Sequence, residues 1–493
     1  MGFIINEKKY NSSFINAKGF THSKGKLIKL FPFATDTASL TDSSADFKSF
    51  KGVTGEFFRT SRGISFQKAI DKEDLLTSIL SDVTTDFSFD LRNLISELFF
   101  DDDSDIVLFD VEILSHLNNK SPNIKLKNLQ VFISNLLVDK EVKQIVNAVL
   151  HAHETQNILY NLVLEHIEKF AIEEDRSWEL GGNYGGRIAL EIRELFKNDL
   201  RNLVFHEEFF IQNVSILLKH YYNQYIIRLT TQLNLMFNEG KKTSPLFYSL
   251  EWEKLSRSRF CLESGWSKLE QSMDDTFVHA NCLELLNTLE GDYGCFAANS
   301  PFAYEEIRET VRSMPQEGKN DLSVKIHRLT QDYVEAIATA EKDNERFNWA
   351  NFVQNETVTE QDWTDEHALK LIDRLFQLIK YQFKNTGRIK PYSEYKLWFT
   401  NFVKNNYIKY RGGLGPTLKV DRSLLLLLTE LSILSTKNDK IVLNKLWAEF
   451  ELRGLYLDHE SKKEVITFFE KINMLEKKSD SGDAQYVRSL LMK

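Results

Sequence analysis

Apolar residues recur at spacings of three and four along most of the chain between roughly Asp110 and Phe383. Such spacing places apolar side chains on one face of a helix, where they can pack into a core. Clear runs of this kind are Leu129, Phe132, Ile133, Leu136 and Leu137; Ile158, Leu159, Leu162, Val163 and Ile167; and Ile211, Val214, Leu217 and Leu218. The pattern predicts a long multi-helical body over residues 106–383.

The first hundred residues show a different pattern. We interpret Lys26–Phe33 and Gly52–Phe66 as β-rich or irregular, and the Ser/Thr/Asp tract Thr35–Asp46 as a loop. The acidic stretch Asp71–Asp74 precedes leucines and isoleucines at helical spacing, which predicts a helix start. We therefore expect a small mixed α/β and irregular region over residues 1–105.

The last 73 residues predict a winged-helix domain, residues 421–493. Its expected elements are a helix Asp421–Leu434, an extended segment Lys440–Leu443, a helix Asn444–Arg453 that ends at Gly454, a helix capped by Asp458, and two strands, Leu475–Lys478 and Ala484–Leu490, around a turn at 479–483. This order of helices and strands is typical of the winged variant of the helix-turn-helix. The whole chain is then expected to be mainly α.

Composition agrees with that fold class. The 493 residues include only 7 prolines and 21 glycines, which favours long helices, and the length fits about three domains. Three cysteines cannot form a disulfide framework, so we expect a reducing cytoplasm. No secretory or myristoylation signal is expected in Met1–Tyr10. The apolar stretch Leu424–Leu434 is too short to span a bilayer, so no membrane partner is expected.

The net charge of −9 argues at first against nucleic-acid binding, because phosphate contacts need Lys and Arg. The charge is segregated, however. Residues 384–422 hold nine basic and two acidic side chains, residues 423–493 hold eleven of each, and the first 383 carry the remaining −16. We therefore predict a basic helical connector over 384–420. Its lysines alternate with aromatic residues, and its Arg411–Gly415 stretch is expected to be a flexible backbone that approaches a ligand closely.

The connector and the winged helix together form the predicted interface with double-stranded DNA. The third helix would present Ser461, Lys462 and Lys463 to a groove, the wing would place Lys477, Lys478 and Arg488 near phosphates, and a second patch would comprise Lys404, Lys409 and Arg411. The alternative is a winged helix that docks a protein, because Glu460 and Glu464 would repel phosphates. Tyr395, Phe399 and Phe402 have helical spacing and are expected in the core.

Other candidate sites carry little chemistry. The loop Gly181–Arg187 could cradle an anion or form a tight corner between helices, and it lacks the Lys-Ser/Thr ending of a P-loop. His279 and Cys282 are expected to be buried in a helix rather than bound to zinc, and Asp101–Asp105 to form a solvated turn rather than a metal site. Glu460–Lys462 is a weak nuclease triplet. We expect no catalytic residue, no cofactor, no metal and no small-molecule substrate.

Several segments resemble the DptG family, the G subunits of the bacterial DNA phosphorothioation-dependent restriction system. The segments are Arg453–Asp458, Ser461–Lys463 and Glu476–Val487, with Leu250–Lys254 and Gly265–Trp266 upstream. The chain length is also similar, so the resemblance covers nearly the whole protein, although these segments lie beyond residue 249. No active-site motif of the family is carried over.

The resemblance implies a subunit of a three-protein antiviral complex whose other members carry ATPase and helicase-like motifs. Such a complex attacks DNA that lacks sulfur in its backbone, while separate enzymes protect host DNA by sulfur replacement of a phosphate oxygen. We therefore expect a non-catalytic, DNA-binding scaffold in the bacterial cytoplasm, associated with the nucleoid when bound. A pure assembly protein and a cryptic metal-dependent nuclease are the alternatives.

Overall fold

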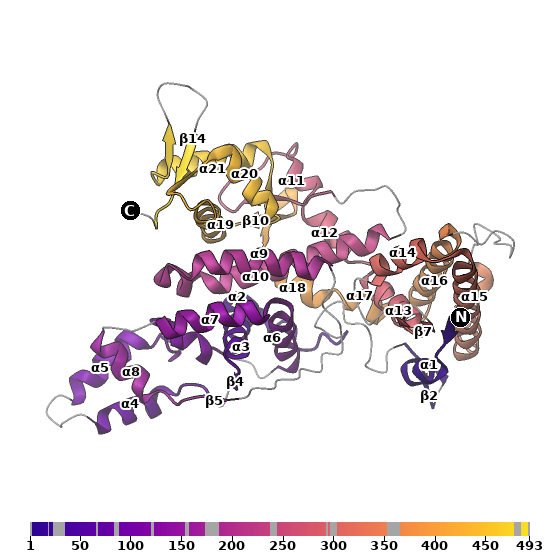
Figure 1. The fold of residues 1–493 in the computed structure, drawn as a ribbon, viewed down its shortest axis with the longest axis horizontal. Helices are drawn as coiled ribbons and strands as arrows, with labels where there is room; N and C mark the ends of the chain where they lie inside the picture. Colours follow the sequence, from indigo (N-terminus) through magenta and orange to yellow (C-terminus); the bar gives the residue numbers. More distant parts are fainter. Residues whose placement is uncertain are drawn as a thin grey trace.

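The computed structural model describes residues 2–17, 19–22, 35–65, 68–82, 88–119, 123–152, 157–172, 187–236, 244–291, 294–295, 303–352, 365–477 and 485–491. These residues are mostly helical, and the strands among them are short (Figure 1). The prediction of a mainly α chain is confirmed.

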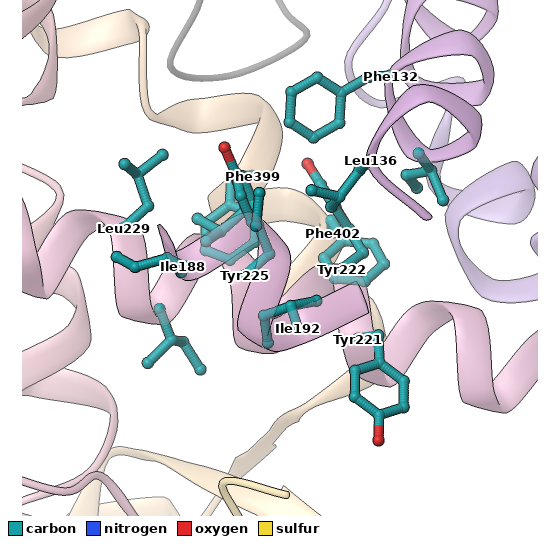
Figure 2. Packing of buried hydrophobic residues seen from close by; sticks show 14 of the residues in the cluster. Phe132, Leu136, Ile188, Ile192, Tyr221, Tyr222, Tyr225, Leu229, Phe399 and Phe402 are labelled. Carbon is teal, nitrogen blue, oxygen red and sulfur yellow. The ribbon is translucent and has the colours of Figure 1, made fainter. Parts of the chain in front are cut away.

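The body is organised around two long helices, α9 (Arg187–Leu203) and α10 (Glu207–Leu235). Three tyrosines of α10, Tyr221, Tyr222 and Tyr225, are buried, and Figure 2 shows Tyr222 and Tyr225 among aromatic residues of other helices. Tyr222 contacts Phe399 and Phe402, whereas Tyr225 contacts Phe132. Helix α10 therefore joins parts of the core that lie far apart in the chain.

Helices from the first half of the chain pack on one side of α10. They are α2 (Ser44–Ser49), α3 (Lys51–Arg62), the 3-10 turn η2 (Val111–His116), α6 (Ile124–Leu137) and α7 (Lys140–Ala152). The short strands β4 (Ile64–Ser65) and β5 (Ala171–Ile172) pair antiparallel beside them.

The prediction that Gly52–Phe66 is β-rich or irregular is wrong, because most of this segment forms α3. The two glycines inside α3 do not break the helix but allow close contacts. A Cβ at Gly52 would lie 1.9 Å from Asn119 Oδ1, and one at Gly55 would lie 1.9 Å from Leu117 O. The other expected β-rich segment, Lys26–Phe33, lies outside the described residues.

Three further helices form a separate small group: α4 (Lys72–Ser81), α5 (Ser88–Phe99) and α8 (Ile158–His166). Asp71 caps α4 by accepting a hydrogen bond from Asp74 N–H, which confirms the predicted helix start. The group has a hydrophobic cluster of its own, distinct from the large core. We call these three helices and the turn after α5 the α4–α5–α8 module.

The middle of the chain forms the other half of the body. Its elements are α11 (Phe260–Glu263), α12 (Trp266–Ser272), α13 (Thr276–Leu286), α14 (Ala303–Ser313), α15 (Gln316–Ala340), η3 (Trp349–Asn351), α16 (Asp365–Asn385), α17 (Ile389–Glu394) and α18 (Leu397–Asn406). The N-terminal elements pack here: β1 (Ile4–Ile5), α1 (Glu7–Phe14), β2 (Ile15–Asn16) and β3 (Gly19–Phe20). β1 pairs with β7 (Leu289–Gly291), which pairs with β8 (Gly294–Cys295).

A four-stranded sheet connects the body with the end of the chain. Its order is β12 (Tyr456–Leu457), β6 (Phe247–Leu250), β10 (Pro416–Val420) and β9 (Ile408–Tyr410). β6 lies parallel to both β12 and β10, whereas β9 and β10 form an antiparallel hairpin around the 3-10 turn η4 (Gly412–Leu414). The predicted helical connector is therefore helical only up to Asn406.

The C-terminal unit, described over 421–477 and 485–491, follows this sheet. Its elements are α19 (Arg422–Leu434), β11 (Lys440–Val442), α20 (Leu443–Leu452), β12, α21 (His459–Lys471), β13 (Leu475–Lys477) and β14 (Gln485–Arg488). β14 is the central strand between β11 and β13, with both pairs antiparallel. Asp458 caps α21 as predicted, and Asp421 likewise caps α19.

Candidate nucleic-acid interface

The segment 453–461 attaches the C-terminal unit to the body. Arg453 follows α20 and donates two hydrogen bonds to Asp199 of α9, from Nε at 2.8 Å and from an Nη at 2.6 Å. Both side chains are buried, at 4% and 1% exposure. Tyr221 of α10 donates a third hydrogen bond to Asp199 at 2.6 Å. The charge pair is thus enclosed and well satisfied by hydrogen bonds.

Gly454 is the next residue of this attachment, and its φ of +82° requires the left-handed conformation. A Cβ at this position would lie 1.9 Å from Gln224 Oε1 on α10. The prediction that Gly454 ends the helix is confirmed, and the contact with Gln224 is a second reason for a glycine here.

Gly454→Ala is therefore expected to destabilise the protein by about 2 kcal/mol, since left-handed backbone disfavours alanine and Gln224 must move. Gly413→Ala is a matched control, because a Cβ at Gly413 would have no neighbouring atom within 4 Å and its φ is not positive. Thermal denaturation of both variants tests this. Equal melting temperatures for the two would contradict it.

The first turn of α21 is enclosed by residues 253–259 of the body. Arg259 donates to both carboxylate oxygens of Asp458, at 3.0 and 2.7 Å, and to Glu253 at 3.2 Å. Burial raises the pKa of Asp458, but hydrogen bonds from Arg259 and from the Ser461 N–H outweigh burial and hold the pKa below its ordinary value. The turn that a recognition helix would insert into a groove is thus occupied within the chain.

Ser461 shows this most directly. Its side chain is buried at 0% exposure, its hydroxyl donates to Glu253 at 3.0 Å, and it accepts from Arg259 at 2.7 Å. Its predicted role as a DNA contact does not fit this structure, because no part of the hydroxyl faces solvent. Ser461 belongs instead to the attachment of the C-terminal unit.

The two neighbouring lysines differ in their surroundings. Lys462 is partly buried, pairs with Glu451 at 3.2 Å and lies over the ring of Trp447. Lys463 is exposed and pairs with Glu460 at 3.0 Å, so its ammonium group remains open to solvent. Lys463 is the better placed of the two for a phosphate.

Further basic side chains lie on the three-stranded sheet of the C-terminal unit. Lys440 of β11 and Arg488 of β14 are directly opposite each other in the antiparallel register. Lys440 pairs with Glu476 at 2.9 Å, whereas Arg488 is exposed and donates through Nε to Asn473 O at 2.8 Å. Like charges at opposed positions destabilise a strand pair unless an anion bridges them. The side chain of Lys477, and the whole of Lys478, lie outside the described residues.

Two of the three side chains in the predicted second patch donate hydrogen bonds to residues 249–253 of the body. Arg411 donates to Leu250 O at 2.6 Å, to Glu253 O at 2.7 Å and to Ser249 Oγ at 3.1 Å. Lys409 donates to Glu251 O. Arg411–Gly415 is thus a closed turn tied to β6 rather than a flexible loop, and Arg411 does not fit a role as a free DNA contact. Lys404, in contrast, is exposed in the last turn of α18.

Part of the remaining positive charge of residues 384–422 is also taken up inside the chain, although Lys384 and Lys390 are exposed. Lys396 pairs with Asp274, and Lys419 pairs with Glu251 at 2.6 Å. Arg422 lies over the rings of Trp252 and Phe468. The excess of +7 in the sequence is therefore not a continuous basic surface in space. Tyr395, Phe399 and Phe402 are buried, as predicted.

The remaining candidate sites are the His279 and Cys282 pair, the acidic turn after α5 and the loop before α9. His279 and Cys282 are buried in α13, as expected, and Asp101–Asp103 are exposed in a turn. Among the described residues, no group of three or more His, Cys, Asp or Glu side chains is arranged to hold a metal ion. The loop residues Gly181–Gly186 lie outside the described residues.

The attachment could not be predicted from the sequence because its partners are distant in the chain. Asp199 precedes Arg453 by more than 250 residues, and nothing local marks either as half of an ion pair. The attachment would be predicted only by considering Arg453, Gly454 and Asp458 together with Leu250–Lys254. These are separate stretches of the sequence.

No protein-family model matches the chain, and no curated protein matches it either. Within the part of the chain that the structure describes, no helix is both long and apolar enough to cross a membrane.

Proposed function

We propose that this protein is a non-catalytic scaffold subunit of a phosphorothioation-dependent restriction complex, in which it contacts duplex DNA and holds ATPase and helicase-like partners. The resemblance to the DptG family motivates the proposal. Its support from the structure is that Leu250–Lys254 meets two of the other resembling segments, Arg453–Asp458 and Ser461–Lys463. Arg259, which lies between Leu250–Lys254 and Gly265–Trp266, bonds Glu253, Asp458 and Ser461. Residues about 200 positions apart therefore act as one unit.

The C-terminal unit is proposed to be a winged helix. The succession α19, β11, α20, α21, β13, β14 and the sheet order β11-β14-β13 support this assignment. Because the first turn of α21 is enclosed by Glu253 and Arg259, we propose that DNA lies along the sheet face and not along α21.

The observation that carries the DNA contact is the opposed pair Lys440 and Arg488, two cations in register on neighbouring strands. Arg488 is exposed to a phosphate directly, whereas a phosphate at Lys440 would replace Glu476 as the anion that offsets the repulsion of the pair. Lys463 and Lys404 of the predicted set are also exposed, but they lie on α21 and α18 and not on the sheet. Contacts of this kind attract any duplex and read little sequence.

Arg488→Glu combined with Lys440→Glu is expected to weaken duplex binding and to lower the slope of log affinity against log salt by about 0.9 for each lost phosphate contact. Lys342→Glu, an exposed change of the same sign after α15, is the control and is expected to leave the slope unchanged. Fluorescence anisotropy with a labelled duplex from low to moderate salt measures both. An unchanged slope in the double variant would overturn the assignment of this face.

The second candidate is an assembly protein whose winged helix contacts another subunit. The enclosed first turn of α21 favours it, and so does the mixture of Glu464, Glu470, Lys463 and Lys471 on the exposed side of that helix. Absence of any duplex binding by the intact wild-type chain at low salt would favour this candidate over the first.

A further inference from the structure

The α4–α5–α8 module is a small structural unit at one end of the molecule, away from the C-terminal unit (Figure 1). Ile95 and Phe99 of α5 are buried at 0% and 1% exposure and hold that helix on the module's own cluster. The module therefore has a packed interior of its own, and the outward-facing residues of α5 do not take part in it.

Helix α5 also has a second apolar row, beside the buried one. Leu94 and Leu98 are four residues apart and are 42% and 51% exposed, and Leu91, three residues earlier, is partly buried. Residues at these spacings lie above one another on one helix face. Leucines in a row, exposed on a helix whose other face already forms a core, are typical of a protein-binding surface.

The charge around this row is strongly acidic. Between Lys68 and Asp105 the sequence holds eleven acidic and three basic residues, a net charge of −8. Two of the three basic residues are paired inside the module, Lys68 with Asp74 and Arg92 with Glu73. The acidic excess is therefore not cancelled from within.

The acidic residues lie close to the leucine row. Asp90 and Glu97 are exposed on α5 itself, and Asp101, Asp102 and Asp103 are exposed in the turn directly after its last residue. Acidic residues at the C-terminal end of a helix oppose the helix dipole and cost stability. Their concentration at this end is unfavourable for the isolated chain and favourable for a cationic partner.

We propose that the Leu91–Leu94–Leu98 face of α5 binds a protein partner through an amphipathic helix whose apolar stripe is flanked by Lys and Arg. Leucines supply the burial, while Asp90, Glu97 and Asp101–Asp103 select a basic partner. Duplex DNA is repelled by this charge, and a second copy of the chain would oppose like charges. The inference rests on the proposed scaffold role and assigns that role a surface.

The test uses the full-length protein and a fluorescein-labelled amphipathic peptide with leucines at i, i+3, i+4 and i+7 and lysines beside them. Leu94→Ser with Leu98→Ser is expected to weaken peptide binding at least roughly tenfold. Leu190→Ser removes an equally exposed leucine, 48%, on α9 and is expected to bind as wild type. Both replaced leucines are exposed, so the melting temperature of the double variant is expected to stay close to that of wild type.

A second variant keeps the leucines and changes the charge. Asp90→Lys with Glu97→Lys is expected to weaken binding and to remove most of its salt dependence. Failure of wild type to bind the peptide at low salt, wild-type binding by either double variant, or an equal loss in Leu190→Ser would each overturn the proposal. A wild-type dimer that dissociates in the leucine variant would overturn it in favour of a second copy.

The same variants separate this surface from the DNA contact. The leucine double variant is expected to bind duplex DNA with wild-type affinity, because the module lies away from the C-terminal unit that contains Lys440 and Arg488 (Figure 1). Loss of peptide binding with DNA binding intact supports the surface alone. Loss of DNA binding in this variant would overturn the surface as an independent site, whereas absence of DNA binding in the wild type concerns only the proposed function.

Discussion

Arg453→Met is expected to destabilise the protein by about 3–5 kcal/mol, because it leaves the carboxylate of Asp199 buried without its cation. Asp199 is 1% exposed, and the Tyr221 hydroxyl, at 2.6 Å, would remain as a neutral donor to it. A methionine of similar length fills the space, so the loss of stability measures the effect of the missing charge and not of a cavity.

Urea denaturation measures the effect, with two variants beside it. Lys463→Met breaks an exposed ion pair of the same C-terminal unit and is expected to leave the denaturation midpoint unchanged. Arg453→Met combined with Asp199→Leu removes both charges and is expected to recover much of the loss. A single variant as stable as wild type would show that the pair does not hold the C-terminal unit on α9 and α10.

The C-terminal elements could be predicted from sequence because their signals are local. Asp421 and Asp458 accept hydrogen bonds from N–H groups three residues later, and Gly454 ends α20 by its own backbone conformation. Each of these effects acts within one helical turn, so neighbouring residues in the chain contain the information.

The features that the sequence predicts wrongly depend on contacts that are distant in the chain. Gly52 and Gly55 indicate a strand or loop, yet they lie in α3, where Asn119 and Leu117 approach so closely that a side chain would not fit. A count of charges along residues 384–422 indicates a basic surface, yet Lys396 and Lys419 face Asp274 and Glu251. Electrostatic potential depends on neighbours in space, which a window along the sequence does not contain.

The predicted set of DNA contacts changes accordingly. Ser461 and Arg411 suit a DNA contact by residue type and position. Burial and hydrogen bonding instead assign Ser461 to the attachment of the C-terminal unit and Arg411 to the turn tied to β6. Lys440 lies outside the predicted set, because only the pairing of β11 with β14 brings it opposite Arg488. The register of two strands that are distant in the chain decides which cations stand together.

Acidification from pH 7.5 to pH 5 is expected to cost the protein about 6 kcal/mol of stability through three buried histidines, about 2 kcal/mol from each. His22, His220 and His279 are at most 2% exposed. Burial lowers the pKa of His22 and of His279 to about 3 and that of His220 to about 4. Nearby Arg388 adds to the effect at His22, and the carbonyl of Arg453 partly offsets it at His220.

The direction follows from proton binding in the two states. Below about pH 6.5 the unfolded chain protonates these histidines, while the folded chain keeps them neutral down to about pH 4. Stability is therefore complete above pH 7 and falls as the pH decreases from about 6.5 toward 4. Urea denaturation midpoints at pH 7.5, 6 and 5 measure the loss. His279→Gln is expected to remove about a third of it. A midpoint that does not change between pH 7.5 and pH 5 would contradict the neutral, enclosed state of these side chains. A histidine that binds a proton only in the unfolded chain must lower the folding stability of the protein over this interval.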